Sequence, residues 1–310
     1  MKINFLSKLA ISLCLITLTI IGCKKKEDTP DPTPKVATIS SIVVSAEWLK
    51  DNLDATNILV IDARGGTDSS FATKDHIPGA IKVGMGQFDT PNPQGFNDLE
   101  SASAFSTHLA ALGINKNKAI VIYADNVSSW GADGRILWSL RMAGFNNTAL
   151  LDGGINYWTT AGYPLTKTVV APTPTTATAI TYDSTYTATI HYVKNNFSTI
   201  KLLDSRAQTE YDGAQLYGEA RGGHLVGATL LTYTNIFNAD KRIKNQADLE
   251  AIFTAAGITK QDNIVTYCTA GFRSAHLAMI LRYAGYTNAR NYDGSFAEWA
   301  AADSTNYPVE

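Results

Sequence analysis

Cysteine and net charge are both scarce in this sequence, and each scarcity excludes a class of protein. The 310 residues include three cysteines, and two of them, Cys14 and Cys23, lie close to the N-terminus. Cys268 therefore has no partner for an internal disulfide, and one cysteine cannot form a cysteine-rich structural zinc site. The formal net charge is −2, and no concentrated basic face is evident, which argues against a nucleic-acid partner.

A long apolar segment is also lacking. The apolar run over residues 9–21 is too short for an ordinary membrane span, and with Lys2 and Lys8 before it the run predicts the core of a secretory signal. It ends at Gly22-Cys23, which resembles the processing site of bacterial lipoproteins, where the cysteine becomes the lipidated first residue. An uncleaved anchor is the alternative. We predict a signal peptide over residues 1–22 and lipidation of Cys23.

The segment after Cys23 predicts a tether to the cell envelope. Residues 23–36 combine charge with alternating proline, a composition that cannot build a core. The residue after Cys23 is Lys24 rather than aspartate, so by analogy with known sorting patterns the outer membrane is favoured, with the protein facing the periplasm or the cell surface. The lysine, glutamate and aspartate that follow resemble surface-export tags of some bacterial lipoproteins; a plain solvated tether is the alternative.

The folded part contains an internal repeat of five blocks in one order, too many for chance. The paired blocks are residues 58–64 and 200–206, 76–80 and 224–228, 120–123 and 263–267, 141–145 and 282–286, and 152–158 and 293–299. We therefore predict two domains, residues 37–165 and 182–310. The intervening residues 166–181 are rich in threonine, proline and alanine and predict a linker.

Each copy alternates between predicted strands and predicted helices. Short β-branched runs at residues 58–61 and 264–266 indicate buried strands. Residues 102–112 and 247–256 show helical spacing of apolar residues, with Gly113 and Gly257 just beyond. Alternation of this kind is typical of an α/β domain in which helices cover both faces of a parallel sheet.

The repeated blocks carry a resemblance to a known family. An Asp-x-Arg after the first strand, a His-x-x-Gly-Ala turn, a Tyr-Cys loop entering a helix and a final Asp-Gly with a tryptophan together resemble the tandem rhodanese family, the thiosulfate and 3-mercaptopyruvate sulfurtransferases. The resemblance implies two tandem domains, each a mostly parallel five-stranded sheet flanked by helices. It also implies a catalytic C-terminal copy that uses neither a metal nor an organic cofactor.

The segment around Cys268 can supply a reactive thiolate. Cys268 follows a predicted strand and precedes a predicted helix, so it lies at the sheet edge where ligands bind in such folds. Backbone N–H groups at the helix start favour an anion and lower the pKa of a thiol. Gly271 allows a tight loop, and Arg273 adds a positive charge whose planar fork suits an oxyanion. We predict that Cys268 is the nucleophile and carries a persulfide.

Substrate contacts are expected from this loop and from the arginine after the first strand, the latter because the family places it beside the loop. The predicted substrate-binding residues are Arg206, Thr269, Ala270, Gly271, Phe272 and Arg273. Asp204 is expected to order the loops by hydrogen bonding, His224 to belong to the turn architecture, and His276 to packing or the surface.

The predicted function is transfer of sulfane sulfur from thiosulfate to cyanide or a thiol. Phosphatase relatives place five residues between cysteine and arginine, whereas four separate Cys268 from Arg273. Mercaptopyruvate enzymes usually carry a different loop sequence, and this chain departs from it at four positions. Many thiosulfate enzymes carry a basic residue at the position of Ala270, which this chain does not. A 3-mercaptopyruvate sulfurtransferase and a non-enzymatic sulfur-binding surface lipoprotein remain the alternatives.

The N-terminal copy is predicted to be non-catalytic. Alignment on Tyr123 and Tyr267 places Ala124 opposite Cys268, and a longer loop without a thiol follows. For Arg64, Asp125 and Trp130 we expect core or surface roles, with a contribution to the cleft between the copies as the alternative.

Overall fold

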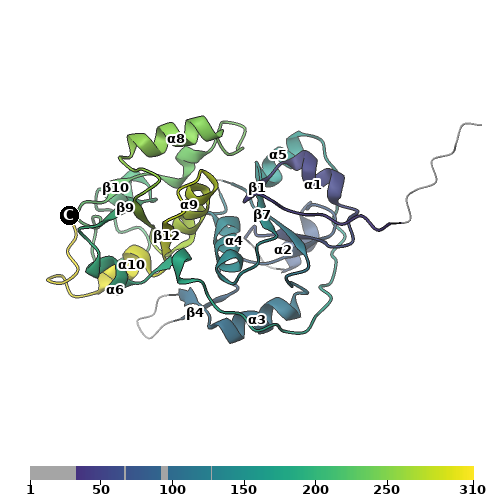
Figure 1. Cartoon of the computed structure of the whole chain (residues 1–310), viewed down its shortest axis with the longest axis horizontal. Helices are drawn as coiled ribbons and strands as arrows, with labels where there is room; N and C mark the ends of the chain where they lie inside the picture. The colour runs from purple at the N-terminus through teal and green to yellow at the C-terminus, as the bar shows by residue number, and fades with distance from the viewer. Residues whose placement is uncertain (1–32, 66–67, 92–96, 127) are drawn as a thin grey trace, which may run out of the picture. The chain divides into compact units, whose positions relative to one another are not determined.

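The computed structural model describes residues 33–65, 68–91, 97–126 and 128–310, and Lys35–Glu310 forms one compact unit (Figure 1). The predicted signal peptide and Cys23 lie outside the described residues, as does most of the predicted tether. In the part that is described, no helix is long and apolar enough to cross a membrane.

The N-terminal copy is built on a five-stranded parallel sheet. Its strands, in the spatial order β1-β7-β6-β2-β3, are β1 (Val43–Val44), β7 (Thr148–Leu151), β6 (Ala119–Tyr123), β2 (Ile58–Asp62) and β3 (Ala80–Lys82). Every residue of the central strand β6 is buried. Its continuous apolar sequence is therefore that of a strand covered on both faces.

The C-terminal copy repeats this arrangement strand for strand. Its order, β10-β9-β11-β12-β8, joins β10 (Thr229–Leu230), β9 (Ile200–Asp204), β11 (Asn263–Tyr267), β12 (Ala289–Tyr292) and β8 (Thr187–Ala188), all parallel. The predicted strands at 58–61 and 264–266 are confirmed as β2 and β11, and the predicted α/β fold of two five-stranded sheets is confirmed with them.

Helices flank both sheets. The N-terminal copy contains α1 (Ala46–Asn52), α2 (Asp68–Thr73), α3 (Ala102–Ala111), α4 (Ala132–Met142) and α5 (Gly154–Thr160), and the C-terminal copy contains α6 (Ile190–Asn195), α7 (Gln208–Tyr211), α8 (Gln246–Ala255), α9 (Phe272–Tyr283) and α10 (Ser295–Ala301). Short 3₁₀ turns cover Ser184–Tyr186 and Tyr233–Ile236. The predicted helices at 102–112 and 247–256 are α3 and α8, each begun by an N-cap side chain, Ser101 or Asn245.

One element has no counterpart among the predicted ones. An antiparallel pair, β4 (Asp89–Pro91) and β5 (Asn97–Leu99), precedes α3. Three-residue strands of mixed polarity give no clear periodic signal, so the sequence did not mark them. Of the predicted linker, residues 166–181, Thr166 pairs with His76 in an isolated bridge and residues 167–181 carry no helix or strand. The segment packs on the N-terminal copy, where Thr175 donates its N–H to the carbonyl of Ala110.

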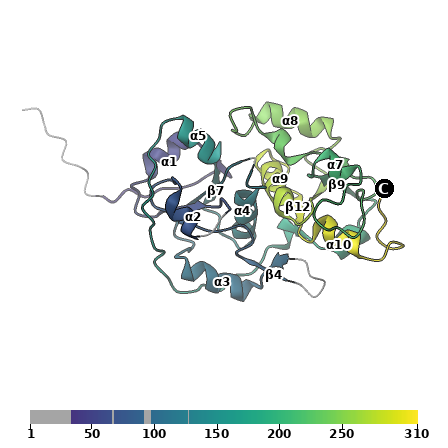
Figure 2. The same ribbon diagram turned by 180° about the vertical axis from the view of Figure 1, so that it is seen from behind.

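Helices α4 and α9 lie side by side between the two sheets (Figures 1 and 2). A Cβ atom at Gly134 would overlap the Cα and Cβ atoms of His276, so glycine is required where the two helices come closest. The hydrophobic core is continuous across this interface, since one cluster of buried side chains includes Ile136 of α4 and Leu277 of α9. The copies therefore share a core.

Reciprocal polar contacts also join the copies. The Asp152 carboxylate, after β7, accepts the N–H of Ile243 in the C-terminal copy at 2.7 Å. Asp293, after β12, accepts the N–H of Leu99 in the N-terminal copy at 3.1 Å. Arg135 of α4 is buried and pairs with both Asp293 and Asp89. In each copy, the loop that follows the last strand of the sheet, β7 or β12, thus holds the neighbouring copy.

Candidate functional site: a thiol at the start of helix α9

Cys268 occupies the turn between strand β11 and helix α9. Gly271 begins the helix in the left-handed conformation, with φ of 80°. A Cβ atom there would also lie 2.5 Å from the carbonyl oxygen of Asp293. Glycine is therefore required for both its conformation and its size, and it sets the curvature that brings Cys268 to the N-terminus of α9.

The backbone of this loop is fixed by the start of α10. The N–H of Phe296 donates to the carbonyl of Cys268 at 2.9 Å, and the N–H of Ala297 donates to the carbonyl of Thr269 at 3.0 Å. The N–H of Cys268 donates to Oγ of Ser295 at 3.2 Å. Ser295 has a φ of 53°, an uncommon conformation for serine. The loop carbonyls are thus held by the start of α10, and no motif in the sequence indicated the part that Ser295 plays.

The surroundings of Cys268 favour the thiolate. Burial raises the pKa of the Cys268 thiol, but the positive charge of Arg273 and hydrogen bonds from Ser274 and the Ala270 backbone lower it, and the net result is a pKa below the usual value. These groups sit at the N-terminus of α9, where the helix dipole also favours an anion. The sequence-based prediction of a lowered pKa agrees with this balance.

Arg273 is not a free cation, because a carboxylate that the sequence analysis missed pairs with it. Both terminal nitrogens of Arg273 donate to the Glu210 carboxylate at 2.7 Å, and Nη2 also donates to Oγ1 of Thr269 at 2.8 Å. The Thr269 hydroxyl donates to Glu210 at 2.8 Å. Glu210 is 1% exposed and lies on α7, far from the loop in sequence. A bidentate pair of this kind fixes the orientation of Arg273, and the carboxylate offsets part of its positive charge.

A cavity of about 310 Å³ opens above Cys268. Five of the predicted site residues line it: Cys268, Thr269, Ala270, Phe272 and Arg273. The rest of the lining is Met85, Trp130 and Tyr217, of which the first two belong to the N-terminal copy. Trp130 therefore takes the role that was the alternative in the sequence analysis, at the cleft between the copies.

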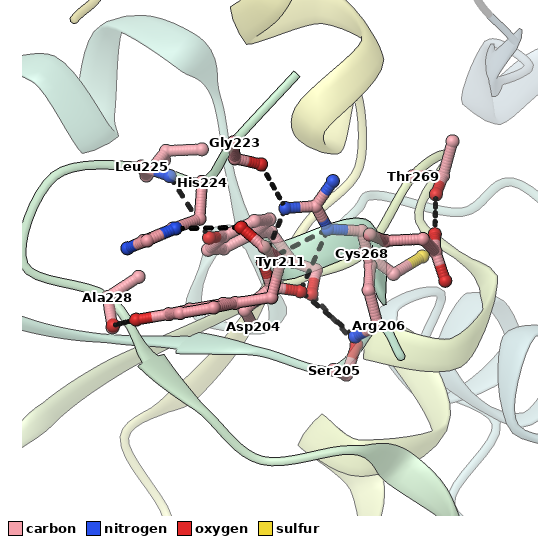
Figure 3. A network of polar contacts seen from close by, with 12 residues as sticks. Asp204, Ser205, Arg206, Tyr211, Gly223, His224, Leu225, Ala228, Cys268 and Thr269 are labelled. Carbon is pink, nitrogen blue, oxygen red and sulfur yellow. Dashed lines mark hydrogen bonds and ion pairs between the residues drawn. The ribbon is translucent and has the colours of Figure 1, made fainter. Parts of the chain in front are cut away.

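Arg206 lies apart from this cavity. Its guanidinium is fully buried and donates from Nε and Nη2 to Asp204, and from Nη2 to the carbonyl of Gly223 (Figure 3). The ring of Phe296 lies 3.9 Å from its guanidinium carbon. In this position Arg206 has no exposed surface for a substrate. The predicted roles of Asp204 in ordering loops and of His224 in the turn fit their bonds, His224 Nδ1 being 3.0 Å from the Tyr211 carbonyl oxygen.

A second, larger cavity of about 580 Å³ lies between α10 and the β4–β5 hairpin. Its polar lining includes Asp98, His191, Asp293 and Glu298. Within the described residues, no three histidine, cysteine, aspartate or glutamate side chains group as metal ligands. No cysteine lines this larger cavity, whereas Cys268 lines the smaller one, which is therefore the candidate active site.

Known proteins are similar to this chain in both sequence and fold. Residues 45–161 and 189–302 each match the Rhodanese-like domain. The sulfur carrier protein TtuD of Thermus thermophilus is 30% identical over 271 residues, covering 83% of this chain and 93% of that protein. The thiosulfate sulfurtransferase of Corynebacterium glutamicum is 27% identical over 281 residues, covering 86% of this chain and 90% of that protein.

Solved structures agree on the architecture. The anaerobic ergothioneine biosynthesis enzyme of Chlorobium limicola superposes with a TM-score of 0.77 at 22% identity, covering 87% of this chain and 70% of that one. YnjE superposes with a TM-score of 0.73 at 22% identity, covering 86% of this chain and 68% of that one. Because the family domain matches twice, on the two sheets that repeat one topology, the chain belongs to the rhodanese family of sulfurtransferases as a tandem-domain member.

Proposed function

We propose that this protein is a thiosulfate sulfurtransferase that moves sulfane sulfur to cyanide or a thiol through a persulfide on Cys268. The observation that carries the proposal is a cysteine with a lowered pKa at the start of α9, lining a cavity. The thiosulfate sulfurtransferase of Corynebacterium glutamicum and the sulfur carrier of Thermus thermophilus both support sulfur as the transferred group.

The donor step is a displacement at sulfur. The Cys268 thiolate attacks the outer sulfur of thiosulfate, a new S–S bond forms to Cys268, and the old S–S bond breaks with its electron pair leaving on sulfite. The acceptor then attacks the outer sulfur of the persulfide, and Cys268 leaves as a thiolate. This is covalent catalysis with a ping-pong course. Because sulfite is a good leaving group, the step requires no separate general acid.

The loop can stabilise the anionic persulfide as well as the thiolate. Groups that lower the pKa of Cys268, namely Arg273 and the N–H groups of Ala270 and Ser274, face the same sulfur. Donors held in place before the reaction stabilise developing charge without reorganisation. Glu210 accepts hydrogen bonds from both terminal nitrogens of Arg273 and so holds its positive charge in place near the sulfur. The hydrogen-bond donors for the persulfide are then the N–H groups of the loop.

A second candidate is sulfur carriage without turnover of a small-molecule acceptor. The similarity to a protein named as a sulfur carrier favours it. A 3-mercaptopyruvate donor is a further alternative, against which the loop residues Thr269, Phe272 and Arg273 argue. An enzyme turns over many times with thiosulfate and cyanide, whereas a carrier is loaded once and waits for its partner.

The test is intact-mass measurement after exposure to thiosulfate, paired with steady-state thiocyanate formation. Wild-type protein should gain the mass of one sulfur atom and release thiocyanate repeatedly when cyanide is present. Cys268→Ser should do neither, because oxygen cannot carry the persulfide. Activity above a trace in Cys268→Ser would contradict the assignment of the nucleophile, and loading without turnover would favour the carrier.

We also propose that Cys23 is lipidated and anchors the protein in the cell envelope, with the outer membrane favoured. The support is the short apolar run at residues 9–21, the Gly22-Cys23 site and the charged, proline-rich segment after it. Several acyl chains hold a protein stably where one holds it only marginally. Mass spectrometry of the mature N-terminus and fractionation of Cys23→Ala test this; a soluble wild-type protein that begins elsewhere would contradict the anchor alone.

A further inference from the structure

The walls of the cavity above Cys268 are apolar and come from both copies. Met85 and Trp130 of the N-terminal copy face Tyr217 and Phe272 of the C-terminal copy. Met85, Trp130 and Tyr217 are each between 42% and 51% exposed, unusual values for large hydrophobic side chains. Exposed apolar residues that gather at one opening mark a binding site more often than scattered ones do.

Trp130 is held in place rather than free at the surface. Its ring packs edge-on against the Tyr217 ring, with centroids 5.5 Å apart and planes at 87°. The Arg273 guanidinium lies 5.3 Å from the Trp130 ring centroid. Trp130 also has a φ of 58°, and left-handed backbone at a bulky residue is uncommon and gathers at functional sites.

Charge within the cavity is nearly balanced. Arg273 is the only cation among the described residues that line it, and Glu210 engages both of its terminal nitrogens. The N–H groups of the loop can bind a small anion at the thiol. The other walls of the cavity are aromatic rings and Met85, which carry no charge. A cavity of about 310 Å³ reaches the size of about 300–1,000 Å³ that small organic ligands occupy. Thiosulfate or cyanide would fill little of it.

We infer that the preferred sulfur acceptor is an organic thiol with an apolar or aromatic group, and that Trp130 of the non-catalytic copy determines this specificity. The inference rests on the proposed persulfide of Cys268. The acceptor's thiolate attacks the outer persulfide sulfur, an S–S bond forms to the acceptor, and the bond to Cys268 breaks with its electron pair returning to Cys268. The acceptor's organic group packs between Trp130 and Phe272, which orients its sulfur toward Cys268.

The experiment compares two thiols that differ only in one group. Full-length protein is loaded with thiosulfate, freed of donor, and mixed with 2-phenylethanethiol or 2-mercaptoethanol below saturation; loss of the sulfur mass gives the rate. Because the measurement starts from loaded protein, the donor step does not enter. The variants are Trp130→Gly, which removes the ring at a position where glycine is unstrained, and Trp130→Phe, which keeps an aromatic ring. Val169→Ala in the exposed linker is the control.

Wild-type protein should transfer sulfur to the phenyl thiol about tenfold faster, a difference that contact with aromatic rings can supply. Trp130→Gly should lose most of this preference, while Trp130→Phe and Val169→Ala retain it. Equal rates for the two thiols in wild-type protein, or an unchanged preference in Trp130→Gly, would overturn the inference and leave the proposed function intact. Wild-type protein that takes no sulfur from thiosulfate would instead contradict the proposed function, and the inference with it.

Discussion

The two copies share one backbone framework but differ in the charge and the thiol that they place at one loop. In both, the loop enters a helix through a left-handed glycine, Gly131 with φ of 74° before α4 and Gly271 with φ of 80° before α9. Counting from these glycines, the second helical residue is Asp133 in the N-terminal copy and Arg273 in the C-terminal copy. The cysteine position holds Ala124, whose carbonyl accepts the N–H of Ile155, just as the Cys268 carbonyl accepts that of Phe296.

This comparison separates framework from chemistry. In the N-terminal copy, Nε of Arg64 donates to Asp62 at 3.0 Å and Nη2 donates at 2.6 Å. The Arg206–Asp204 pair repeats this geometry at 3.0 and 2.7 Å. Because a copy without a thiol keeps the pair, we interpret it as part of the framework that orders the loops. The thiol, and the charge of Arg273 that favours its ionisation, are what the C-terminal copy adds.

The corresponding loop of the N-terminal copy is longer and reaches the cavity above Cys268. Six residues separate Ala124 from Gly131, but two separate Cys268 from Gly271. The longer loop ends in Trp130, which lines the cavity above Cys268. A loop that contains no cysteine thus contributes a wall of the cavity above Cys268.

The largest expected effect comes from moving the cysteine between the copies. Cys268→Ser combined with Ala124→Cys should remain inactive, because Asp133 would raise the pKa of a thiol at position 124 where Arg273 lowers that of Cys268. Thiocyanate formation and intact mass measure the result. Sulfur on position 124, or activity in the double variant, would show that the framework alone suffices; Ala124→Cys in the wild-type background is the control for folding.

Removal of the Arg273 charge should have the next largest effect. Arg273 lowers the pKa of Cys268, so in Arg273→Gln the rise of the alkylation rate should move to higher pH. At a fixed pH below that rise, less thiolate is present and the rate falls. An unchanged pH profile would contradict the electrostatic role.

The same variant leaves Glu210 buried without its partner, which costs about 3 kcal/mol in the free energy of unfolding. The double variant Arg273→Gln with Glu210→Gln removes both charges and should recover much of this stability. Its thiol should keep the raised pKa. Comparing the single and double variants therefore distinguishes the effect of the lost Arg273 charge from the effect of lower stability.

The smallest effect should come from the contact between the copies. Gly134→Ala places a methyl group against the backbone of His276 and should lower the free energy of unfolding by about 2 kcal/mol. A Cβ atom at Gly84 meets no atom within 4 Å, so Gly84→Ala is the matched control and should change stability by less than about 0.5 kcal/mol. Denaturant unfolding measures both. Equal stability of the two variants would mean that the helices separate easily.

The sequence predicted the framework well because the framework is repeated. Blocks such as residues 58–64 and 200–206 occur twice with their periodicity intact, so both sheets and the position of the Cys268 loop could be inferred. Contacts between distant segments could not be inferred in this way. Glu210 on a short helix gives no sign of its partner Arg273, and Trp130 stands in a loop whose direction only packing determines.

Burial also could not be predicted from residue type alone. Arginine is mostly exposed in proteins, so a surface contact with substrate was a natural expectation for Arg206. Its carboxylate partner and the ring of Phe296 instead enclose it completely. A pair that satisfies its charge locally can be buried, and the N-terminal copy shows the same pairing in Arg64.

The continuous core between α4 and α9 makes the two copies one cooperative folding unit. Separating them would divide this shared cluster of buried side chains and would leave Arg135 without Asp293. Because the copies share this core and Trp130 lines the cavity above Cys268, a mutation that unfolds the N-terminal copy should also remove one wall of that cavity.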